Sequence, residues 1–182
     1  MNNDKRIKKI AILGPESTGK STLCTQLASH YKTQWVREYA REYLAKNGTA
    51  YTFEDLYKIA QGQIANEETH AGLQVSENDT SLFIDTNLYV IKIWSEFAFN
   101  KCDNRILTEI SKRTYDLYLL CNIDLPWVKD ELREYPDIEI RRKLFSYYKE
   151  ELCEQKTPWV IISGDYEERL QAAIAAADAI LF

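Results

Sequence analysis

The feature that most constrains this chain is an eight-residue loop, Gly14-Pro15-Glu16-Ser17-Thr18-Gly19-Lys20-Ser21. It follows the apolar run 10–13 and precedes a segment with helical periodicity, residues 21–30. A G-x-x-x-x-G-K-[ST] loop between a strand and a helix is the arrangement that cradles nucleotide phosphates. Glycine lets backbone N–H groups approach phosphate oxygens, and the helix N-terminus adds its positive dipole end. The sequence therefore predicts a phosphate-binding loop rather than an ordinary strand-to-helix turn.

The loop also predicts which atoms hold the nucleotide. Lys20 can reach the β- and γ-phosphates, and the hydroxyl of Ser21 can ligate Mg²⁺. We expect ATP and Mg²⁺ as the bound species. The residues expected to bind the nucleotide are Gly14, Glu16, Ser17, Thr18, Gly19, Lys20, Ser21 and Thr22.

Short apolar runs alternate with helical periods along the whole chain, which predicts a parallel sheet covered on both faces. The predicted strands are 8–13, 33–36, 81–84, 117–121 and 159–162, and the predicted helices are 21–30, 38–46, 53–73, 89–99, 107–113, 137–154 and 166–182. Asn78-Asp79 is expected to break the chain before the third strand. The fold class that follows is α/β, a three-layer P-loop NTPase sandwich with a sheet of about five mostly parallel strands and a helical lid. Residues 1–182 are expected to form a single P-loop kinase domain.

Composition limits the kinds of partner and the cellular compartment that we expect for this protein. The net charge is −5, which argues against a general nucleic-acid surface because such surfaces need clustered Lys and Arg. The four cysteines form no C-x-x-C pair, as expected of free thiols in a reducing compartment. The apolar runs are too short to span a bilayer. We expect a cytoplasmic protein, a monomer or small homo-oligomer, that binds neither membrane nor nucleic acid.

Asp85 ends the apolar run 82–84. An acid at the carboxyl end of a central strand faces the ligand crevice of an open α/β sheet. Beside a phosphate loop, Asp85 could complete the Mg²⁺ shell with Ser21 or bind the phosphoryl acceptor. The alternative is an ordinary N-cap for the next helix.

The block 37–42 follows the second predicted strand and is expected to stand over the γ-phosphate. Glu38 could accept the proton of an acceptor hydroxyl, and Arg37 or Arg41 could hold the acceptor or neutralise phosphate charge. Arg41 is the preferred acceptor contact, and Tyr39 is a further expected substrate contact. The alternative is a solvated helix face, because Glu38 and Arg41 are an i, i+3 pair.

Residues 127–142 carry acids and arginines between the fourth strand and the next helix. Arg141 falls on that helix's apolar stripe, where a charge must pair, extend to solvent or meet an anion. The functional interpretation is a mobile lid whose Arg133 or Arg141 reaches the transferring phosphoryl group, with Trp127 as a substrate contact. A solvated helix with surface ion pairs is the alternative.

The blocks 12–21, 37–42, 83–86 and 127–133 together resemble the ribosylnicotinamide kinase domain of NadR-type proteins. The order and spacing of these blocks agree over nearly the whole chain, and the Glu-Tyr-Ala-Arg-Glu block is more specific than the phosphate loop. The resemblance implies transfer of the ATP γ-phosphoryl group to the 5′-hydroxyl of nicotinamide riboside, which gives nicotinamide mononucleotide. Lys20, Glu38, Asp85, Arg133 and Arg141 are the expected catalytic residues.

The chain departs from the family pattern at three points. Few residues precede the first strand, so the adenylyltransferase activity of NadR-type proteins is expected to be absent. Arg37 stands where the family tends to carry an aromatic residue, with Trp35 nearby as a candidate replacement, and an aromatic residue is missing near Ala65. These differences concern the pocket for the base. The alternatives are therefore a kinase for another nucleoside or metabolite, or a nucleotide-regulated P-loop binding protein.

Overall fold

The computed structural model describes residues 6–72 and 81–182. The strands are β1 (Lys8–Leu13), β2 (Trp35–Val36), β3 (Ser81–Asp85), β4 (Leu117–Cys121) and β5 (Trp159–Ile162). The helices are α1 (Lys20–Tyr31), α2 (Tyr39–Asn47), α3 (Phe53–Gly72), α4 (Leu88–Phe99), α5 (Asn104–Ser111), α6 (Ile138–Glu154) and α7 (Tyr166–Leu181). The predicted break at Asn78-Asp79 lies outside the described residues.

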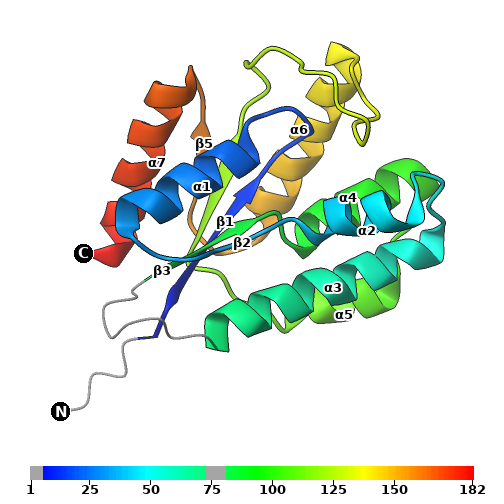
Figure 1. The fold of residues 1–182 in the computed structure, drawn as a ribbon, viewed down its shortest axis with the longest axis horizontal. Helices are drawn as coiled ribbons and strands as arrows, with labels where there is room; N and C mark the ends of the chain where they lie inside the picture. Colours follow the sequence, from blue (N-terminus) through cyan, green and yellow to red (C-terminus); the bar gives the residue numbers. More distant parts are fainter. Residues whose placement is uncertain (1–5, 73–80) are drawn as a thin grey trace.

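The strands form one parallel sheet in the order β2-β3-β1-β4-β5, and Figure 1 shows the sheet between its covering helices. The chain runs from β1 to one side for β2 and β3, then crosses to the other side for β4 and β5. The carboxyl end of β1 is therefore where the strand order reverses, and ligand crevices of open α/β sheets form at such points. The predicted three-layer α/β class is confirmed.

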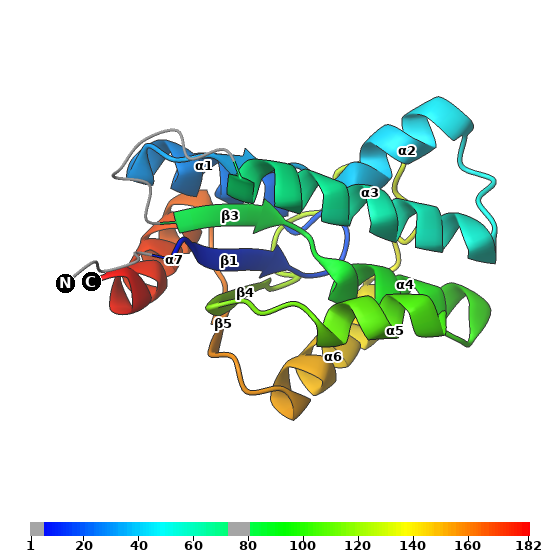
Figure 2. The same ribbon diagram turned by 90° about the horizontal axis from the view of Figure 1, so that it is seen from below.

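Alternate residues of the strands supply two separate cores, because successive side chains of a strand point to opposite faces. Ile10 and Ile12 pack with α1 and α7 on one face. Ala11 and Leu13 pack with α4 and α6 on the other. Figure 2 shows α1 and α7 together on one side of the strands and α6 on the opposite side. All of these β1 side chains are fully buried, so β1 holds the phosphate loop from the centre of the molecule.

A third core lies beyond the edge of the sheet, among α2, α3, α4 and α5. Leu56, Ile59, Leu88, Ile91 and Ile106 form its buried centre. This helical layer is visible to the right of the sheet in Figure 1. It places one face of α4 opposite the phosphate loop.

Two predicted boundaries differ from the structure for identifiable reasons. The strand expected at 33–36 is only Trp35–Val36, because the Thr33 N–H bonds to Ala28 O at 2.9 Å and completes the end of α1. The short helix expected at 107–113 begins at Asn104 instead, where the side chain of Asp103 caps it by accepting from Arg105 N. In both cases hydrogen bonds at a helix end set the boundary.

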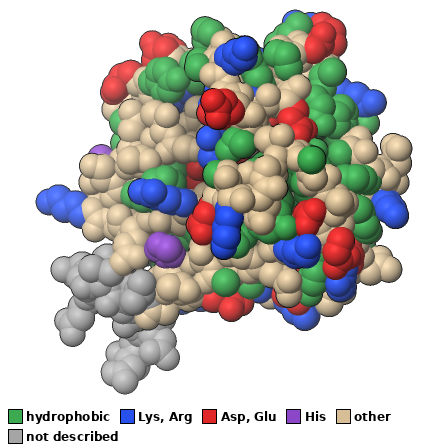
Figure 3. Space-filling view, turned by 45° about the vertical axis from the view of Figure 1, so that its right-hand side comes forward, with side chains coloured by type: hydrophobic (Ala, Val, Ile, Leu, Met, Phe, Trp, Pro, Cys, Tyr) green, Lys and Arg blue, Asp and Glu red, His purple; other side chains and the backbone are tan. Residues whose placement is uncertain are grey.

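In the described part of the chain, no helix combines the length and hydropathy needed to cross a membrane. On the face that Figure 3 presents, basic side chains are interspersed with acidic ones rather than gathered into one patch. All four cysteines are free thiols, as expected, and Cys24 and Cys121 are buried.

Candidate active site

The phosphate loop leaves β1 in a conformation that only glycine adopts easily. Gly14 has φ of 137°, and a Cβ there would lie 2.7 Å from the carbonyl oxygen of Cys121. Within the loop, Thr18 Oγ1 donates to Pro15 O at 2.8 Å, and Lys20 Nζ donates to the same carbonyl at 2.8 Å. The loop is thus closed on itself, with the lysine folded along it.

Arg169 of α7 supports the loop from below, and sequence reasoning missed it. Its side chain is 2% exposed, and it donates to Thr18 O at 3.0 Å, Gly164 O at 2.7 Å and Asn122 O at 3.1 Å. It also pairs with Asp124. One guanidinium therefore fixes the phosphate loop to the segments that follow β4 and β5. Arg169 stands four residues before Ala173 and eight before Ala177, so the helical spacing of α7 marks a buried face but does not indicate the contact with the loop.

Asp85 lies beside the start of the loop, because β3 pairs with β1 in a register that sets Asp85 next to Ile12. The side chain is 2% exposed, and among the described atoms its Oδ1 has no hydrogen-bond partner. Burial raises the pKa of Asp85, and the Lys20 charge, a hydrogen bond from Ser21 and the Arg41 charge oppose that rise. The N-cap of α4 is Asn87, so Asp85 does not serve the capping alternative.

Glu38 is the N-cap residue of α2, but its side chain makes no capping hydrogen bond. The carboxylate faces Arg41, with Arg41 Nε 3.7 Å from Glu38 Oε2. The pKa of Glu38 is raised by burial and by the nearby Asp85 carboxylate, while Lys20 and Arg41 lower it. The predicted i, i+3 pair thus exists, and it faces the phosphate loop rather than open solvent.

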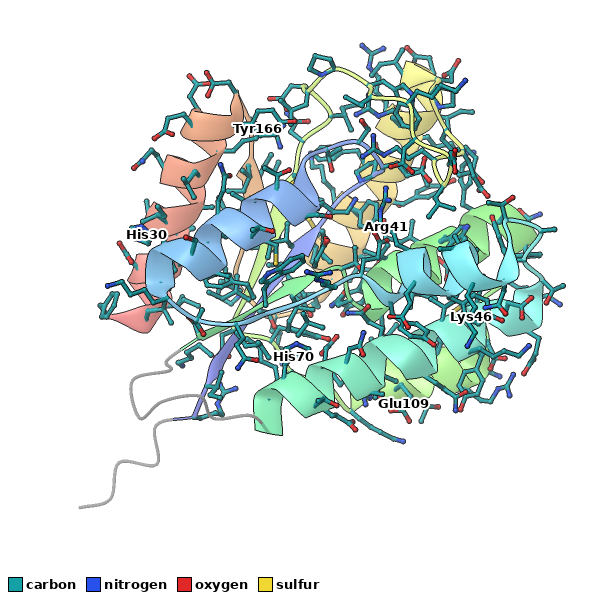
Figure 4. All side chains as sticks on the ribbon, in the orientation of Figure 1. His30, Arg41, Lys46, His70, Glu109 and Tyr166 are labelled. Carbon is teal, nitrogen blue, oxygen red and sulfur yellow. The ribbon has the colours of Figure 1, made fainter. Side chains whose placement is uncertain are left out.

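The segment 127–136 covers the loop and will be called the lid segment. Glu16 accepts hydrogen bonds from the backbone N–H groups of Glu134 (2.9 Å) and Tyr135 (3.1 Å). Ser17 Oγ accepts from Val128 N at 2.9 Å. Arg41 joins α2 to the lid segment through Asp130, with an N–O distance of 2.9 Å. Figure 4 labels Arg41 near the centre of the molecule, at the start of α2.

Both candidate arginines of the lid reach the phosphate loop. Arg133 Nη1 lies 3.3 Å from Ser17 Oγ, and Arg141 Nη2 lies 3.4 Å from Ser17 O. Their guanidinium groups lie 5.9 and 5.5 Å from the ring centre of Trp127. Arg141 is 3% exposed on the apolar stripe of α6, as predicted, and its Nε has no partner among the described residues. Burial and the Arg133 charge lower the pKa of Arg141, so an anion here would relieve a real electrostatic cost.

A cavity of about 180 Å³ runs from the phosphate loop to α4. Its polar end includes Lys20, Ser21, Glu38, Arg41 and Arg133. Its apolar wall is formed by Leu44, Val90, Ile93, Trp94, Phe97, Leu132, Tyr135, Leu144 and Tyr148. A charged end joined to an aromatic wall suits a ligand with one polar and one flat apolar part.

The structure separates the predicted site residues into two groups. All the predicted loop residues, with Glu38, Arg41 and Arg133, line the cavity. The other predicted site residues, Asp85, Arg141, Tyr39 and Trp127, are not in its wall. Asp85 and Arg141 are buried, and Trp127 lies beside the lid arginines. Tyr39 packs against Gly62 of α3 instead. Trp35 packs with α1 and α7, and the exposed Arg37 lies over its ring, so neither replaces the missing aromatic.

Sequence reasoning missed most of the cavity wall. Val90, Ile93, Trp94 and Phe97 share one face of α4, at the i, i+3, i+4, i+7 spacing that marks any buried helix face. The spacing indicates a buried helix face, but it does not distinguish a face that packs against protein from one that lines a cavity.

The fold and the phosphate loop together define a P-loop nucleotide-binding protein. A model of an AAA domain family (AAA_28) matches residues 9–169, and the chain belongs to this family. The trifunctional NAD biosynthesis/regulator proteins NadR of Escherichia coli (strain K12) and Salmonella typhimurium (strain LT2) are each 29% identical to it over 168 residues. That match covers 90% of this chain and 40% of each relative. The resemblance stated from the sequence is confirmed.

Solved structures show the same fold. A NadR protein in complex with NR matches with a TM-score of 0.80 and 23% identity, over 97% of this chain and 50% of that one. A NadR protein in complex with NAD and AMP-PNP matches with a TM-score of 0.77 and 22% identity, over 97% and 50% of the two chains. The deoxyadenosine kinase from M. mycoides with bound dATP matches with a TM-score of 0.62 and 15% identity, over 94% and 99%.

Proposed function

We propose that this protein is an ATP-dependent nucleoside kinase that phosphorylates the 5′-hydroxyl of nicotinamide riboside to nicotinamide mononucleotide. It acts as a single kinase domain in the cytoplasm, as a monomer or small homo-oligomer. The observation that carries the proposal is the cavity, which joins the phosphate loop to an aromatic wall and has Glu38 and Arg41 between them. A nucleotide-regulated binding protein has no need of a cavity that extends from the phosphate loop to an aromatic wall.

We propose a role in phosphoryl transfer for each charged group of the site. Lys20 and the loop N–H groups hold the β- and γ-phosphates. The oxygen of the acceptor hydroxyl bonds to the γ-phosphorus, and the bond from that phosphorus to ADP breaks. Glu38 takes the proton of the hydroxyl in the same step. Arg41 holds the acceptor. Arg133 and Arg141 neutralise charge on the transferring group, and phosphoryl transfer depends mainly on such positioning and neutralisation.

The residues present fit a Mg²⁺ ion that accompanies ATP. The buried Oδ1 of Asp85 has no partner among the described atoms, and the Ser21 hydroxyl adjoins the same carboxylate. Hard oxygen donors of this kind suit Mg²⁺, which keeps most of its water and phosphate ligands. We propose that Ser21 and Asp85 hold the ion, directly or through water; when bound, it neutralises phosphate charge.

The acceptor is proposed on the similarity to NadR proteins and on the shape of the cavity. The aromatic wall on α4, formed by Trp94 and Phe97, offers a flat surface to a base, and the ribose would then lie near Glu38 and Arg41. The aromatic residue that the family carries before Glu38 is absent, so the wall on α4 does this work in our proposal.

A panel of acceptors tests the proposal. Purified protein is incubated with Mg-ATP and nicotinamide riboside, adenosine, deoxyadenosine, cytidine, uridine or thymidine, and ADP release and product mass are measured. We expect ADP release and a phosphorylated product with nicotinamide riboside at a kcat/KM at least tenfold above the others. Efficient transfer to another nucleoside would overturn the acceptor, and slow hydrolysis with no phosphorylated product would overturn the kinase.

Lys20→Ala is the control for the panel. Lys20 donates to a carbonyl of its own loop, so its loss should cost only about 1 kcal/mol of stability. Turnover should fall by about 100-fold or more, because a positive charge on the phosphates is lost. Thermal unfolding checks the fold of the variant. Near-normal phosphoryl transfer by a folded Lys20→Ala protein would remove Lys20 from the mechanism.

A further inference from the structure

Gln63 of α3 is a buried amide outside the cavity wall, and it contacts two other elements of the site. Its side chain is 1% exposed. Gln63 Oε1 accepts a hydrogen bond from the backbone N–H of Tyr39 at 2.9 Å. Gln63 Nε2 donates to the backbone carbonyl of Thr86 at 3.2 Å. One planar group therefore joins the start of α2 to the end of β3.

The two bonded backbone positions each adjoin a carboxylate of the proposed site. Tyr39 follows Glu38, and Thr86 follows Asp85. Thr86 is also held at a φ of 66°, an uncommon conformation for a residue with a branched side chain. A change in the Gln63 bridge would therefore be passed directly to the backbone that carries each carboxylate.

The bridge also satisfies a backbone group at the start of α2. The first N–H groups of a helix have no partner within the helix, and an N-cap side chain, where it caps, accepts from the second or third of them. In α2 the N–H of Tyr39 is satisfied from outside, by Gln63, and Glu38 makes no capping bond. The Glu38 carboxylate is left to face Arg41 and the phosphate loop.

The approach of α3 to α2 leaves little room for adjustment. A Cβ on Gly62 would lie 2.0 Å from Cε1 of Tyr39, so the tyrosine ring packs directly on the α3 backbone. This contact fixes the height of α2 above α3 next to the Gln63 bridge. A side chain that lacks either the donor or the acceptor cannot recover both bonds by a small shift.

We propose that Gln63 is a positioning residue that sets Glu38 and Asp85 relative to each other for phosphoryl transfer. The inference rests on the proposed kinase function and adds a residue that touches neither nucleotide nor acceptor. Glutamine suits the role because its amide combines a donor and an acceptor on one rigid plane. A displacement of about 1 Å at a reacting group can reduce a rate on the order of 100-fold.

The test compares two substitutions at Gln63 with a matched glutamine elsewhere. Gln63→Met keeps the length and removes both hydrogen bonds, whereas Gln63→Glu keeps the acceptor for Tyr39 and loses the donor to Thr86. The control is Gln155→Met. Gln155 also bridges two backbone positions, through Leu152 O and Thr157 O at 2.9 Å each, but at the far end of α6.

We expect Gln63→Met to lower kcat on the order of 10- to 100-fold, with KM for ATP changed less than threefold. Gln63→Glu should show an intermediate loss, and it carries the test if the methionine variant does not fold. Gln155→Met should lower the unfolding temperature while leaving kcat within twofold of wild type. A kcat for both Gln63 variants equal to that of Gln155→Met would overturn the inference.

A double-substitution cycle distinguishes positioning from stability. If Gln63 acts by placing Glu38 against Asp85, its effect on kcat should shrink at least threefold when measured in Glu38→Gln. The same fold-loss in both backgrounds would overturn the inference while leaving the kinase proposal standing. Absence of phosphoryl transfer in the wild-type protein would instead reject the proposed function itself.

Discussion

Glu38 and Lys20 line the cavity from different elements and carry opposite charges. The Glu38 side chain makes no capping hydrogen bond. Lys20 lies along its own loop, bonded to Pro15, where phosphate oxygens can replace the carbonyl. At the residue scale, the proposed function depends on charged side chains that have few local contacts or can exchange a local contact for a ligand.

The Glu38 carboxylate can be tested by an isosteric change. Glu38→Gln removes the proton acceptor but keeps the shape, so we expect kcat to fall by about 100-fold or more. ATP affinity should change less than threefold, because the phosphates are held by the loop. Steady-state kinetics and nucleotide titration measure the two effects separately. Equal losses of turnover and ATP affinity would contradict the role of Glu38 as a base.

At the scale of elements, the lid segment is joined to the phosphate loop through the side chains of Glu16 and Ser17. Glu16 accepts from two consecutive backbone N–H groups of the lid segment. Burial raises the pKa of Glu16, and these two hydrogen bonds oppose the rise. A second connection runs from Tyr51, whose hydroxyl donates to Glu134 at 3.0 Å and accepts from the Trp94 indole at 2.7 Å. The lid segment thus contacts both the loop and the aromatic wall.

Glu16→Ala tests this connection. Removal of the acceptor carboxylate should loosen the lid segment and lower kcat/KM for ATP by up to a factor on the order of 100, since each of the two charge-assisted hydrogen bonds contributes about 1.5 kcal/mol. Limited chymotrypsin digestion should cut faster after Trp127, whereas Tyr135 is followed by Pro136 and resists cleavage. Glu139→Ala, an exposed change at the start of α6, is the control. Unchanged digestion and kinetics in Glu16→Ala would show that the lid segment is held by other contacts.

At the scale of the whole molecule, a buried acid away from the site ties α3 to the sheet. Glu67 is 1% exposed, and the Tyr115 hydroxyl lies 3.1 and 3.0 Å from its two carboxylate oxygens. Burial raises the pKa of Glu67 from 4.5 to about 7, against opposing contributions from the Tyr115 hydrogen bond, Lys9 and Arg113.

This acid predicts a pH dependence of stability. Between pH 4.5 and about 7 the unfolded chain releases the Glu67 proton while the folded protein keeps it, so the free energy of unfolding falls as pH rises. Glu67→Gln cannot titrate, and it should be more stable than wild type at pH 8 by up to about 3 kcal/mol. Near pH 4.5 the advantage should vanish. Urea unfolding at both pH values measures the difference, and a difference that does not change with pH would refute the assignment.

The fold was largely predictable, and the site only in part. The periodicity of apolar residues and the positions of turn residues are local signals. The bounds predicted from them for five strands and seven helices therefore lie within a few residues of the observed bounds. The predicted loop residues, Glu38 and Arg41 all line the cavity. Tyr39 was predicted as a substrate contact. In the structure its ring packs on the backbone of α3, at a position where Gly62 has no side chain. The position of the Tyr39 ring thus depends on a contact between two different helices, α2 and α3.

The sequence by itself determined the phosphate loop, the alternation of strands and helices, and the buried place of Arg141 on α6. These follow from backbone conformation and from side-chain periodicity, both of which act over a few residues. Only the tertiary structure decided that the α4 face becomes a cavity wall, that Arg169 holds the loop from below, and that Gln63 joins the backbones of Glu38 and Asp85. Each of these depends on which elements the strand order brings together. The sequence of one segment does not indicate which distant segments will lie next to it.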